Sequence, residues 1–473
     1  MKEQRGSYFN QKPKKKYSKL ILLAVEAVLI CAVVAGYFIF MKDFVHKKDG
    51  NTVKQEQNAS GGKNSSGNNT NVSATSTPTP TELTEEEKRE KEAAELLKQA
   101  DAYAIQYDYD KAISLVKGFE NYTQVKVLND ALSGYEEKKS TLKRFGAYDS
   151  ADQINHIFFH ILVADDSKAF DGDYKQKGYN YYMTTIPEFN AMLTQLYDQG
   201  YVLVQIHDVA KKVKNADGSE SFEPGDIMLP PDKKPLVISQ DDVNYYEYMT
   251  GDGFARRIVL DKDNNPTTEM VMDDGTVSVG DYDMVPLLEK FVKEHPDFSY
   301  KGAKGILALT GYEGALGYRT NDASSPTYKE DQQTVKKIVK VMKEKGWEFA
   351  SHSYGHRDMG KATYAFTVKD TDRWEKEVGS LIGPTDIYIF PFGIDIETTM
   401  GHYSSKKFEY LKKSGFDYFC GVYKAPWMQI KSDYVRMTRR PMDGEAMLKF
   451  PERLEDLFDL SKVIDPNRPK WED

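Results

Sequence analysis

The sequence predicts an α/β fold, with a parallel sheet or barrel and its covering helices in residues 150–465. From about Ile154, short apolar runs alternate with amphipathic segments of helical period, the pattern of repeated strand–helix units. Most of these runs are continuously apolar, which is typical of parallel strands that are buried on both faces. Hydrophobic residues make up 40% of the 473 residues, enough for a large core.

The expected strands are short and the expected helices are longer. The strands cover residues 157–159, 201–205, 236–239, 305–309, 348–351, 387–390, 418–422 and 435–438, and the clearest helices cover 186–198, 284–294, 333–345 and 371–381. Within residues 245–280, the turn signals DKDNN and DDG indicate an inserted hairpin. Active sites of such folds gather at the C-terminal ends of the strands, so polar residues that follow a strand are the first candidates.

Residues 20–41 are predicted to form a transmembrane anchor. Their sequence, LILLAVEAVLICAVVAGYFIFM, contains one ionisable residue, Glu26. At ~1.5 Å per residue, it can cross a ~30 Å hydrocarbon core. Residues 1–19 form a basic tail, which the positive-inside rule places in the cytoplasm with the rest of the chain outside. A cleaved signal peptide is the alternative, but the apolar run is long and no A-x-A-like site follows it.

Two segments separate this anchor from the main domain. Residues 42–83 are polar, of low complexity and end in Pro-Thr repeats, so a flexible linker is expected. Residues 84–145 are expected to form a helical spacer, a tetratricopeptide-like hairpin that opens with a capping box at Thr84. One such repeat is not an array, so a structural role is favoured, and binding of a protein partner is the alternative.

Charge and cysteine content exclude several classes of protein. The chain has 64 basic and 73 acidic residues, and this acidic balance argues against nucleic acid as the main partner. Its two cysteines, Cys31 and Cys420, exclude a disulfide scaffold and a cysteine-ligated zinc site. An exported domain without disulfides suggests a bacterial surface protein, located at the cell membrane with its C-terminal domain outside.

Ionisable residues follow three of the predicted strands. Asp241 and Asp242 end the segment PLVISQDDV, His352 and His356 lie in WEFASHSYGH, and His160 ends HIFFH. A turn or helical start after residue 351 brings the two histidines of HSYGH within ~6 Å, a workable separation for two ligands of one metal ion.

His156 and His160 have the same spacing as the HSYGH pair and serve as an internal comparison. They lie along a predicted strand, where four residues span ~13 Å, so they cannot bind one ion together. Two histidines need a third ligand, and a carboxylate completes a set that leaves coordination positions for water and substrate. The Asp241–Asp242 pair offers both a ligand and a separate base, because adjacent side chains leaving a strand point in different directions.

The motifs SQDD, HSYGH and YIFPFG resemble those of the NodB-like polysaccharide deacetylases, carbohydrate esterase family 4, over about residues 154–444. The resemblance implies a distorted (β/α) barrel in which Asp241 is the general base. It implies that a divalent ion, Zn²⁺ or alternatively Co²⁺ or Ni²⁺, is held by Asp242, His352 and His356.

The resemblance also places a substrate subsite after the strand at 387–390. It implies that the acetylated sugar is bound by Pro391, Phe392 and Gly393, with the Phe392 N–H as an oxyanion donor. The sequence departs from the family at Ile389, where an Arg is usual, and it lacks the Asp-x-x-Asp-Trp and late Leu-x-His motifs.

FFHILV, TTIPEFNAMLTQLYDQGYVLV and MTRRPMDG are instead similar to the poly-N-acetylglucosamine deacetylases of that family. In that subgroup the acidic histidine comes early, which implies that His160 is the general acid. The alternative interpretation is that His160 only caps a strand beside His156.

These observations predict a metal-dependent enzyme that removes N-acetyl groups from an extracellular amino-sugar polymer, poly-N-acetylglucosamine or peptidoglycan. Two alternatives remain. The missing motifs allow a non-catalytic glycan-binding protein on the same fold, and the helices of residues 84–145 allow a membrane-tethered scaffold.

Overall fold

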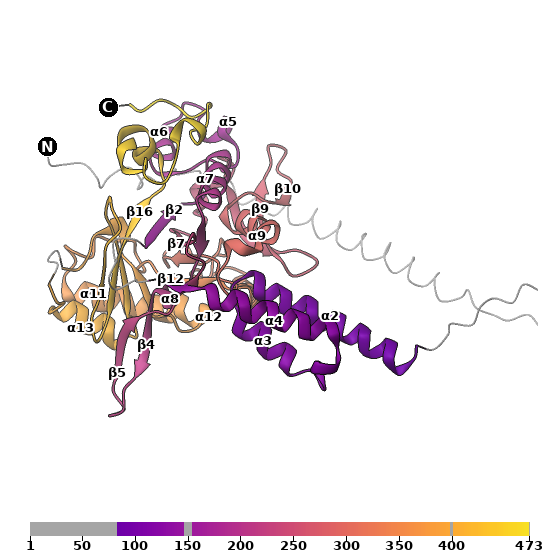
Figure 1. Ribbon diagram of the computed structural model, residues 1–473. Helices are drawn as coiled ribbons and strands as arrows, with labels where there is room; N and C mark the ends of the chain where they lie inside the picture. Colours follow the sequence, from indigo (N-terminus) through magenta and orange to yellow (C-terminus); the bar gives the residue numbers. More distant parts are fainter. Residues whose placement is uncertain (1–82, 146–153, 398–400, 473) are drawn as a thin grey trace, which may run out of the picture. The chain divides into compact units, whose positions relative to one another are not determined.

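The computed structural model describes residues 83–145, 154–397 and 401–472 (Figure 1). The predicted basic tail and membrane anchor, and the predicted linker except for its last residue, lie outside the described residues. Among the described residues, no helix is both long enough and apolar enough to cross a bilayer. Residues Glu82–Asp473 form one compact unit.

Parallel strands in the described part of the chain close into a seven-stranded barrel. Each is hydrogen-bonded to the next, and the ring closes because β7 pairs with β2 on one side and β11 on the other. In ring order the strands are β2 (Asn155–Phe159), β7 (Lys234–Gln240), β11 (Ile306–Leu309), β12 (Glu348–Ser351), β13 (Ile387–Ile389), β14 (Tyr418–Val422) and β16 (Val435–Pro441). The predicted α/β barrel is therefore confirmed.

Two further strands extend the barrel sheet. The predicted strand at 201–205 is present as β3 (Tyr201–Leu203), but it pairs with β7 outside the ring. A short strand, β15 (Met428–Ile430), runs antiparallel to β16.

Side chains of the barrel strands alternate between two buried clusters. Val237, Ala308 and Cys420 belong to one cluster, and their strand neighbours Ile238, Leu307 and Phe419 belong to the other. Cys420 is a free thiol. Burial raises its pKa to about 12, so it is an inert core residue.

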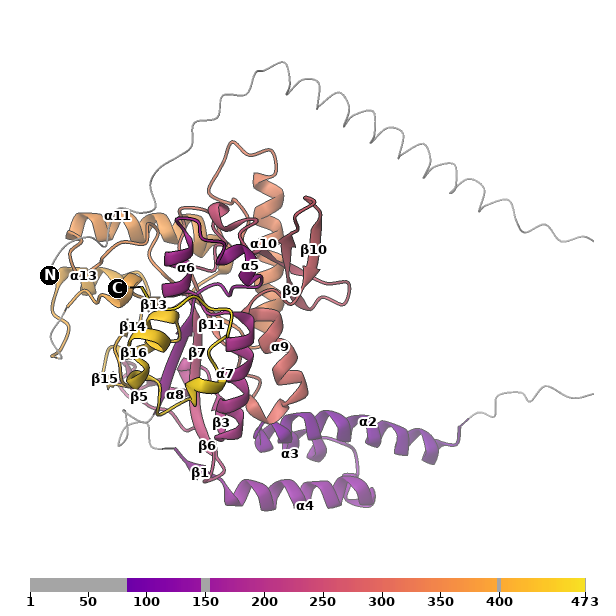
Figure 2. The ribbon, with the colours of Figure 1, turned by 90° about the horizontal axis from the view of Figure 1, so that it is seen from above.

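Helices lie around the barrel strands (Figure 2). The predicted helices at 186–198 and 284–294 are present with those bounds, and the predicted helix at 371–381 is interrupted by a π-helical turn at Glu375–Gly379. The helices of the barrel domain are α5 (Asp166–Ala169), α6 (Gln176–Tyr182), α7 (Ile186–Asp198), α8 (Ile206–Val209), α9 (Met284–Glu294), α10 (Tyr328–Glu344), α11 (Tyr364–Trp374), α12 (Ser380–Ile382) and α13 (Lys406–Lys413).

The insertion at residues 245–280 is more than the predicted hairpin. Its strands β8 (Ala255–Leu260), β9 (Pro266–Val271) and β10 (Val277–Gly280) form a three-stranded antiparallel sheet. The DDG turn reverses the chain a second time, with Gly275 in the left-handed region, and so adds the third strand. A separate hairpin consists of β4 (Ala210–Lys214) and β5 (Glu220–Pro224).

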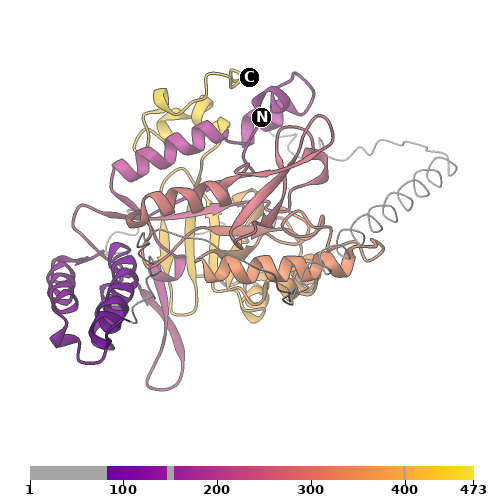
Figure 3. The same cartoon turned by 90° about the vertical axis from the view of Figure 1, so that its right-hand side faces the viewer.

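The segment before the barrel contains three helices (Figure 3). The predicted two-helix hairpin was therefore wrong, because it missed the third helix. They are α2 (Glu85–Ile105), α3 (Tyr109–Lys117) and α4 (Lys126–Thr141). The capping box at Thr84 is confirmed, with the hydroxyl accepting from the Glu87 N–H. The third helix exists because Leu128, Leu132 and Tyr135 bury one face of it against the other two.

Specific hydrogen bonds join these helices to the barrel domain. The Tyr107 hydroxyl donates to the Asp297 carbonyl at 2.9 Å, and the Lys301 N–H donates to the Gln106 carbonyl at 2.9 Å. The strand β1 (Lys143–Arg144) pairs with β6 (Met228–Leu229). The helical segment is therefore a fixed part of the compact unit.

The N-terminal ends of β12 and β13 carry a charged bridge around His207 of α8. The ring contacts Glu348 Oε1 through Nδ1 at 2.5 Å and Asp386 Oδ1 through Nε2 at 2.9 Å. Burial alone would lower the pKa of His207, but the two carboxylates outweigh it and raise the pKa to about 10.

We expect this bridge to stabilise the fold in a pH-dependent way. Because the folded pKa of His207 lies above the ordinary value, its stabilisation is complete below about pH 6.5 and is lost as the pH rises toward about 10. The difference in free energy of unfolding between wild type and His207→Gln should therefore shrink steadily across this range. Urea unfolding at a series of pH values measures it, and a pH-independent difference would contradict the charged bridge.

Candidate active site

All the candidate residues lie at one end of the barrel. Asp241 and Asp242 directly follow β7, His352 follows β12, Pro391 begins a turn after β13, and His160 follows β2. Because the strands are parallel, their C-terminal ends meet at the same rim. The barrel therefore gathers the polar residues that the sequence analysis selected.

Hydrogen bonds of the sheet continue into two of these residues. The Asp241 N–H donates to the Phe159 carbonyl at 2.8 Å, and the His352 N–H donates to the Leu309 carbonyl at 2.9 Å. Both side chains thus start from backbone that is held as firmly as the strands themselves.

Asp242, His352 and His356 form a cluster that can hold a metal ion. One donor atom from each residue lies within 4.8 Å of the other two. His356 Nε2 is 3.8 Å from Asp242 Oδ1, and His352 Nε2 is 3.8 Å from Asp241 Oδ2. Asp241 therefore lies beside the cluster without being one of its three members.

Hydrogen bonds with neighbouring residues orient two of the three ligand side chains, His352 and Asp242. His352 Nδ1 donates to the Ile389 carbonyl at 2.8 Å, which leaves Nε2 for the cluster. Burial lowers the pKa of His352 to about 4, so the ring is neutral and able to bind a metal ion near neutral pH. The Tyr246 hydroxyl donates to Asp242 Oδ1 at 2.7 Å.

The loop that carries the two histidines is held from outside the barrel. Asp370 of α11 accepts hydrogen bonds from the Tyr354 N–H at 2.7 Å and the Gly355 N–H at 2.9 Å. Ser353 and His356 both adopt left-handed backbone, with φ of 53° and 48°. These contacts hold a strained loop in the one shape that brings both imidazoles to the cluster.

Asp241 is paired with a buried arginine from the other side of the rim. Arg439 of β16 donates from Nη1 to Oδ1 at 2.7 Å and from Nη2 to Oδ2 at 2.9 Å. Burial alone would raise the pKa of Asp241, but Arg439 and then His352 outweigh it and hold the pKa well below its ordinary value. Asp241 is therefore ionised and fixed in orientation.

Arg439 also explains the departure at Ile389. The arginine that is usual at position 389, in the motif YIFPFG, is absent. A guanidinium still reaches Asp241, the candidate base, from β16. The sequence analysis quoted MTRRPMDG but gave Arg439 no role in the site, because pairing across the barrel is not visible in a linear motif.

His160 lies at the rim with one nitrogen already engaged. Its Nδ1 donates to the Tyr182 carbonyl at 3.0 Å, so Nε2 is the nitrogen that can exchange a proton. Arg468 of the C-terminal segment secures this end of α6 by donating to the carbonyls of Asn180 and Met183 at 2.8 and 2.9 Å. The carbonyl that orients His160 is thus fixed by the chain's C-terminal segment.

His160 lies near three carboxyl groups. It lowers the pKa of Asp241, of Asp242 and of Asp443. Asp443 is buried, and burial raises its pKa to about 6. Sequence reasoning did not assign Asp443 a role. His156, by contrast, is a buried core residue in contact with Ser239 Oγ at 2.9 Å.

The turn Pro391–Gly393 lies against the metal cluster. The Phe392 ring is 4.5 Å from the His356 ring and is 59% exposed. Phe392 and Gly393 have positive φ values of 57° and 64°. A Cβ added to Gly393 would lie 2.2 Å from the Val422 Cβ, so only glycine fits there.

The structure thus places every sequence-predicted site residue at one rim, with the three candidate metal ligands in direct proximity. The catalytic roles of Asp241 and His160 and the substrate role of the Pro391–Gly393 turn stay predictions. Residues that the sequence analysis missed as supports of the site are Arg439, Asp443, Tyr246 and Asp370. In the sequence, the motifs SQDD and HSYGH indicated the site, and no motif indicated these four supporting residues.

The donor set suits a divalent ion. Two imidazole nitrogens and one carboxylate are the ligands that Zn²⁺ and related ions accept at catalytic sites, and three protein ligands leave room for water or substrate. Each imidazole or carboxylate position is set by a neighbouring hydrogen bond or backbone contact, as metal sites require.

Two of three comparisons with known proteins gave matches. A search of curated proteins found no match. The solved structure of the Streptococcus pyogenes deacetylase PplD in complex with acetate aligns with 13% identity and a TM-score of 0.33, covering 63% of this chain and 97% of that chain. Residues 317–419 match the polysaccharide deacetylase family. The matched segment carries His352, His356 and the Pro391–Gly393 turn.

Proposed function

We propose that this protein is a metal-dependent hydrolase that removes N-acetyl groups from an amino-sugar polysaccharide, poly-N-acetylglucosamine or peptidoglycan. The observation that carries the proposal is the Asp242–His352–His356 cluster with the ionised Asp241 directly beside it. A family match over part of the chain supports deacetylation, and the site chemistry supports the need for a metal ion.

A divalent ion bound by these three residues would polarise the acetyl carbonyl and lower the pKa of a bound water. Asp241 would take a proton from the attacking water, since it is ionised and fixed by Arg439. His160 is placed to return a proton from Nε2 to the leaving amine, because its Nδ1 is held by Tyr182. This proton is required because an amide anion is a poor leaving group.

The developing oxyanion needs a donor as well. The Phe392 backbone N–H, in the turn beside His356, is the proposed donor. The exposed Phe392 ring and the fixed backbone of Gly393 would shape the subsite that receives the acetylated sugar.

We also propose that residues 20–41 anchor the enzyme in a bacterial cell membrane, with the catalytic domain outside and joined by a flexible linker. The single long apolar run and the basic residues before it support this location.

The catalytic proposal predicts that acetate release depends on the metal and on both proton-transfer residues. Treating the purified chain with chelator should abolish acetate release from N-acetylglucosamine oligomers, and adding Zn²⁺ or Co²⁺ should restore it. Asp241→Asn and His160→Gln should each lower kcat by about 10²–10⁴-fold. Both variants should keep the metal content of wild type, whereas Asp242→Asn should lose it.

Turnover by metal-stripped enzyme, or unchanged kcat in Asp241→Asn, would overturn this mechanism. Binding of the oligomers without any acetate release from metal-loaded wild type would instead identify a glycan-binding protein on the same fold.

Arg439 is expected to position the candidate base. Arg439→Lys keeps the positive charge but loses the bidentate hydrogen bonding to Asp241. We therefore expect kcat to fall about 10–100-fold with little change in KM. Arg439→Met leaves a buried carboxylate without a partner and should lower the free energy of unfolding by about 3–5 kcal/mol. Kinetics and urea unfolding measure the two effects. Wild-type kcat in Arg439→Lys would contradict the positioning role.

The proposed membrane anchor predicts in which cell fraction the protein is found. The full-length protein should stay in the membrane fraction after alkaline carbonate extraction, and protease added to cells without their wall should digest the catalytic domain. Removing residues 1–41 should leave the protein in the soluble fraction of the producing cell. A full-length chain that is extracted by carbonate would rule out the anchor.

A further inference from the structure

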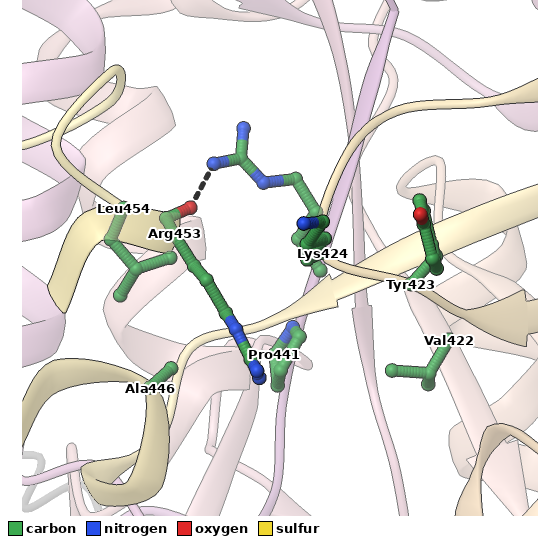
Figure 4. Close-up of a pocket in the computed structure, with 8 residues that line it drawn as sticks. Val422, Tyr423, Lys424, Pro441, Ala446, Arg453 and Leu454 are labelled. Atoms are coloured by element: carbon green, nitrogen blue, oxygen red, sulfur yellow. Dashed lines mark hydrogen bonds between the residues drawn. The ribbon is translucent and has the colours of Figure 1, made fainter. Parts of the chain in front are cut away.

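A second recess lies on the same end of the barrel as the candidate active site. Its volume is about 270 Å³. Val422, which ends β14, and Pro441, which ends β16, form part of its wall. Figure 4 shows Val422 and Tyr423 on one side of this pocket and Ala446 and Leu454 on the other.

The pocket shares structural parts with the active site. Val422 is the residue against which Gly393 packs, so a single residue separates the pocket from the turn proposed to receive the acetylated sugar. The Tyr423 N–H donates to the Arg439 carbonyl at 3.0 Å, which joins the pocket to the arginine that holds Asp241. A polymer that extends from the Pro391–Gly393 turn past Val422 would reach this pocket.

Three of the eight residues that line the pocket are cations, and none is a carboxylate. They are Lys424, Arg440 and Arg453. Lys424 is exposed, and no ion pair joins its ammonium group to any residue of the described ranges. This composition contrasts with a chain whose net charge is −9. A concave surface lined by one sign of charge concentrates ligands of the opposite sign.

Arg440 gives the pocket a rigid wall. It is 3% exposed, and its guanidinium donates to Asp456 at 2.5 and 2.7 Å, to Asn155 at 2.8 Å and to the Arg453 carbonyl. These bonds neutralise most of its charge and fix the backbone from which Arg453 extends. Its Nε–H has no hydrogen-bond partner among the described residues. The Arg453 guanidinium stacks on the Phe450 ring at 3.7 Å, and its Nε lies 4.0 Å from Glu452 Oε1, so it is partly engaged. Lys424 therefore remains for a ligand, with Arg453 as a partly engaged second cation.

The rest of the pocket suits a sugar ring. Tyr423 is 54% exposed, and Pro441 and Leu454 contribute apolar surface. Carbon-rich faces of this kind bind the apolar face of a ring, while cations at the edge bind a charged substituent. The volume, at the low end of the range for small-molecule sites, fits one such unit.

We propose that this pocket binds an anionic group, a carboxylate or a phosphate, on a sugar near the one that is deacetylated. The proposal rests on the deacetylase function given above and deepens it. It assigns the enzyme to acidic polymers in preference to neutral poly-N-acetylglucosamine, with Lys424 and Arg453 as the residues that determine this specificity.

The test compares three N-acetylated oligosaccharides of equal length: a neutral N-acetylglucosamine oligomer, a glycan strand with muramic acid carboxylates, and an oligomer with a phosphodiester. Full-length wild type should show a lower KM for one or both acidic substrates, and added salt should reduce this preference. Lys424→Gln and Arg453→Gln should each raise that KM about three- to tenfold without changing kcat. The KM for the neutral oligomer should stay constant.

Lys413→Gln is the matched control, because Lys413 is an exposed lysine of α13 that does not line the pocket. It should leave every KM unchanged. Equal effects of the pocket variants on neutral and acidic substrates, or no effect on either, would overturn the proposal. The acidic substrate that responds distinguishes a carboxylate from a phosphate ligand.

Binding keeps this test separate from the test of catalysis. Calorimetric titration of each oligosaccharide into chelator-treated protein should show weaker binding of the acidic ligand by the double variant than by wild type. If no acetate is released but this difference persists, the pocket stands and the proposed function fails. If acetate is released and the difference is absent, the proposed function stands and the pocket assignment fails.

Discussion

The pairing of β7 with both β2 and β11 is the constraint on which the site depends. It closes the barrel, and it brings the ends of strands that are far apart in sequence to one rim. Asp241 and Asp242 leave this rim directly from β7, and the sheet hydrogen bond from Asp241 to β2 fixes their direction. Because the chemistry needs atoms placed to within a fraction of an ångström, loops alone would be a poor foundation for it.

Because the barrel is closed, an arginine on one strand can take the place of an arginine that is missing from another strand. Ile389 stands where the related motif has an arginine, and Arg439 reaches the same carboxylate from β16. A buried carboxylate without a cation would lower the stability of the fold, so Asp241 needs a guanidinium beside it. Any strand that reaches this rim of the barrel can supply that guanidinium, whatever its position in the sequence. The same reasoning applies to His160, which precedes the metal motifs in sequence and still lies near their carboxylates.

The features that could be predicted from the sequence depend on interactions between neighbouring residues. The features that could not be predicted depend on contacts made across the fold. The strands 348–351 and 418–422, the helices 186–198 and 284–294, and the capping box at Thr84 depend on local patterns and were predicted with their observed bounds. His352–His356 could be told apart from His156–His160 because only one pair follows its strand. The partners Arg439 and Asp443 could not be predicted as such, since each acts across the fold on a residue far away in the sequence. Asp370 could not be predicted either, because its contact with the histidine loop depends on how α11 packs and not on a local motif.

The two ends of the barrel are built for different purposes. At the N-terminal end, His207 bridges two carboxylates and stabilises the start of two strands. At the end with the candidate active site, Asp242, Ser353, His356 and Phe392 all adopt left-handed backbone, which costs about 1 kcal/mol or more at each residue. That strain is held by the hydrogen bond that Tyr246 donates to Asp242, by those that Asp370 accepts from the Tyr354 and Gly355 N–H groups, and by the core below. Since the candidate metal ligands sit on the strained segments, we expect loss of those hydrogen bonds to act first on the geometry of the cluster. The stability of the barrel, which rests on its other end and its core, is affected less.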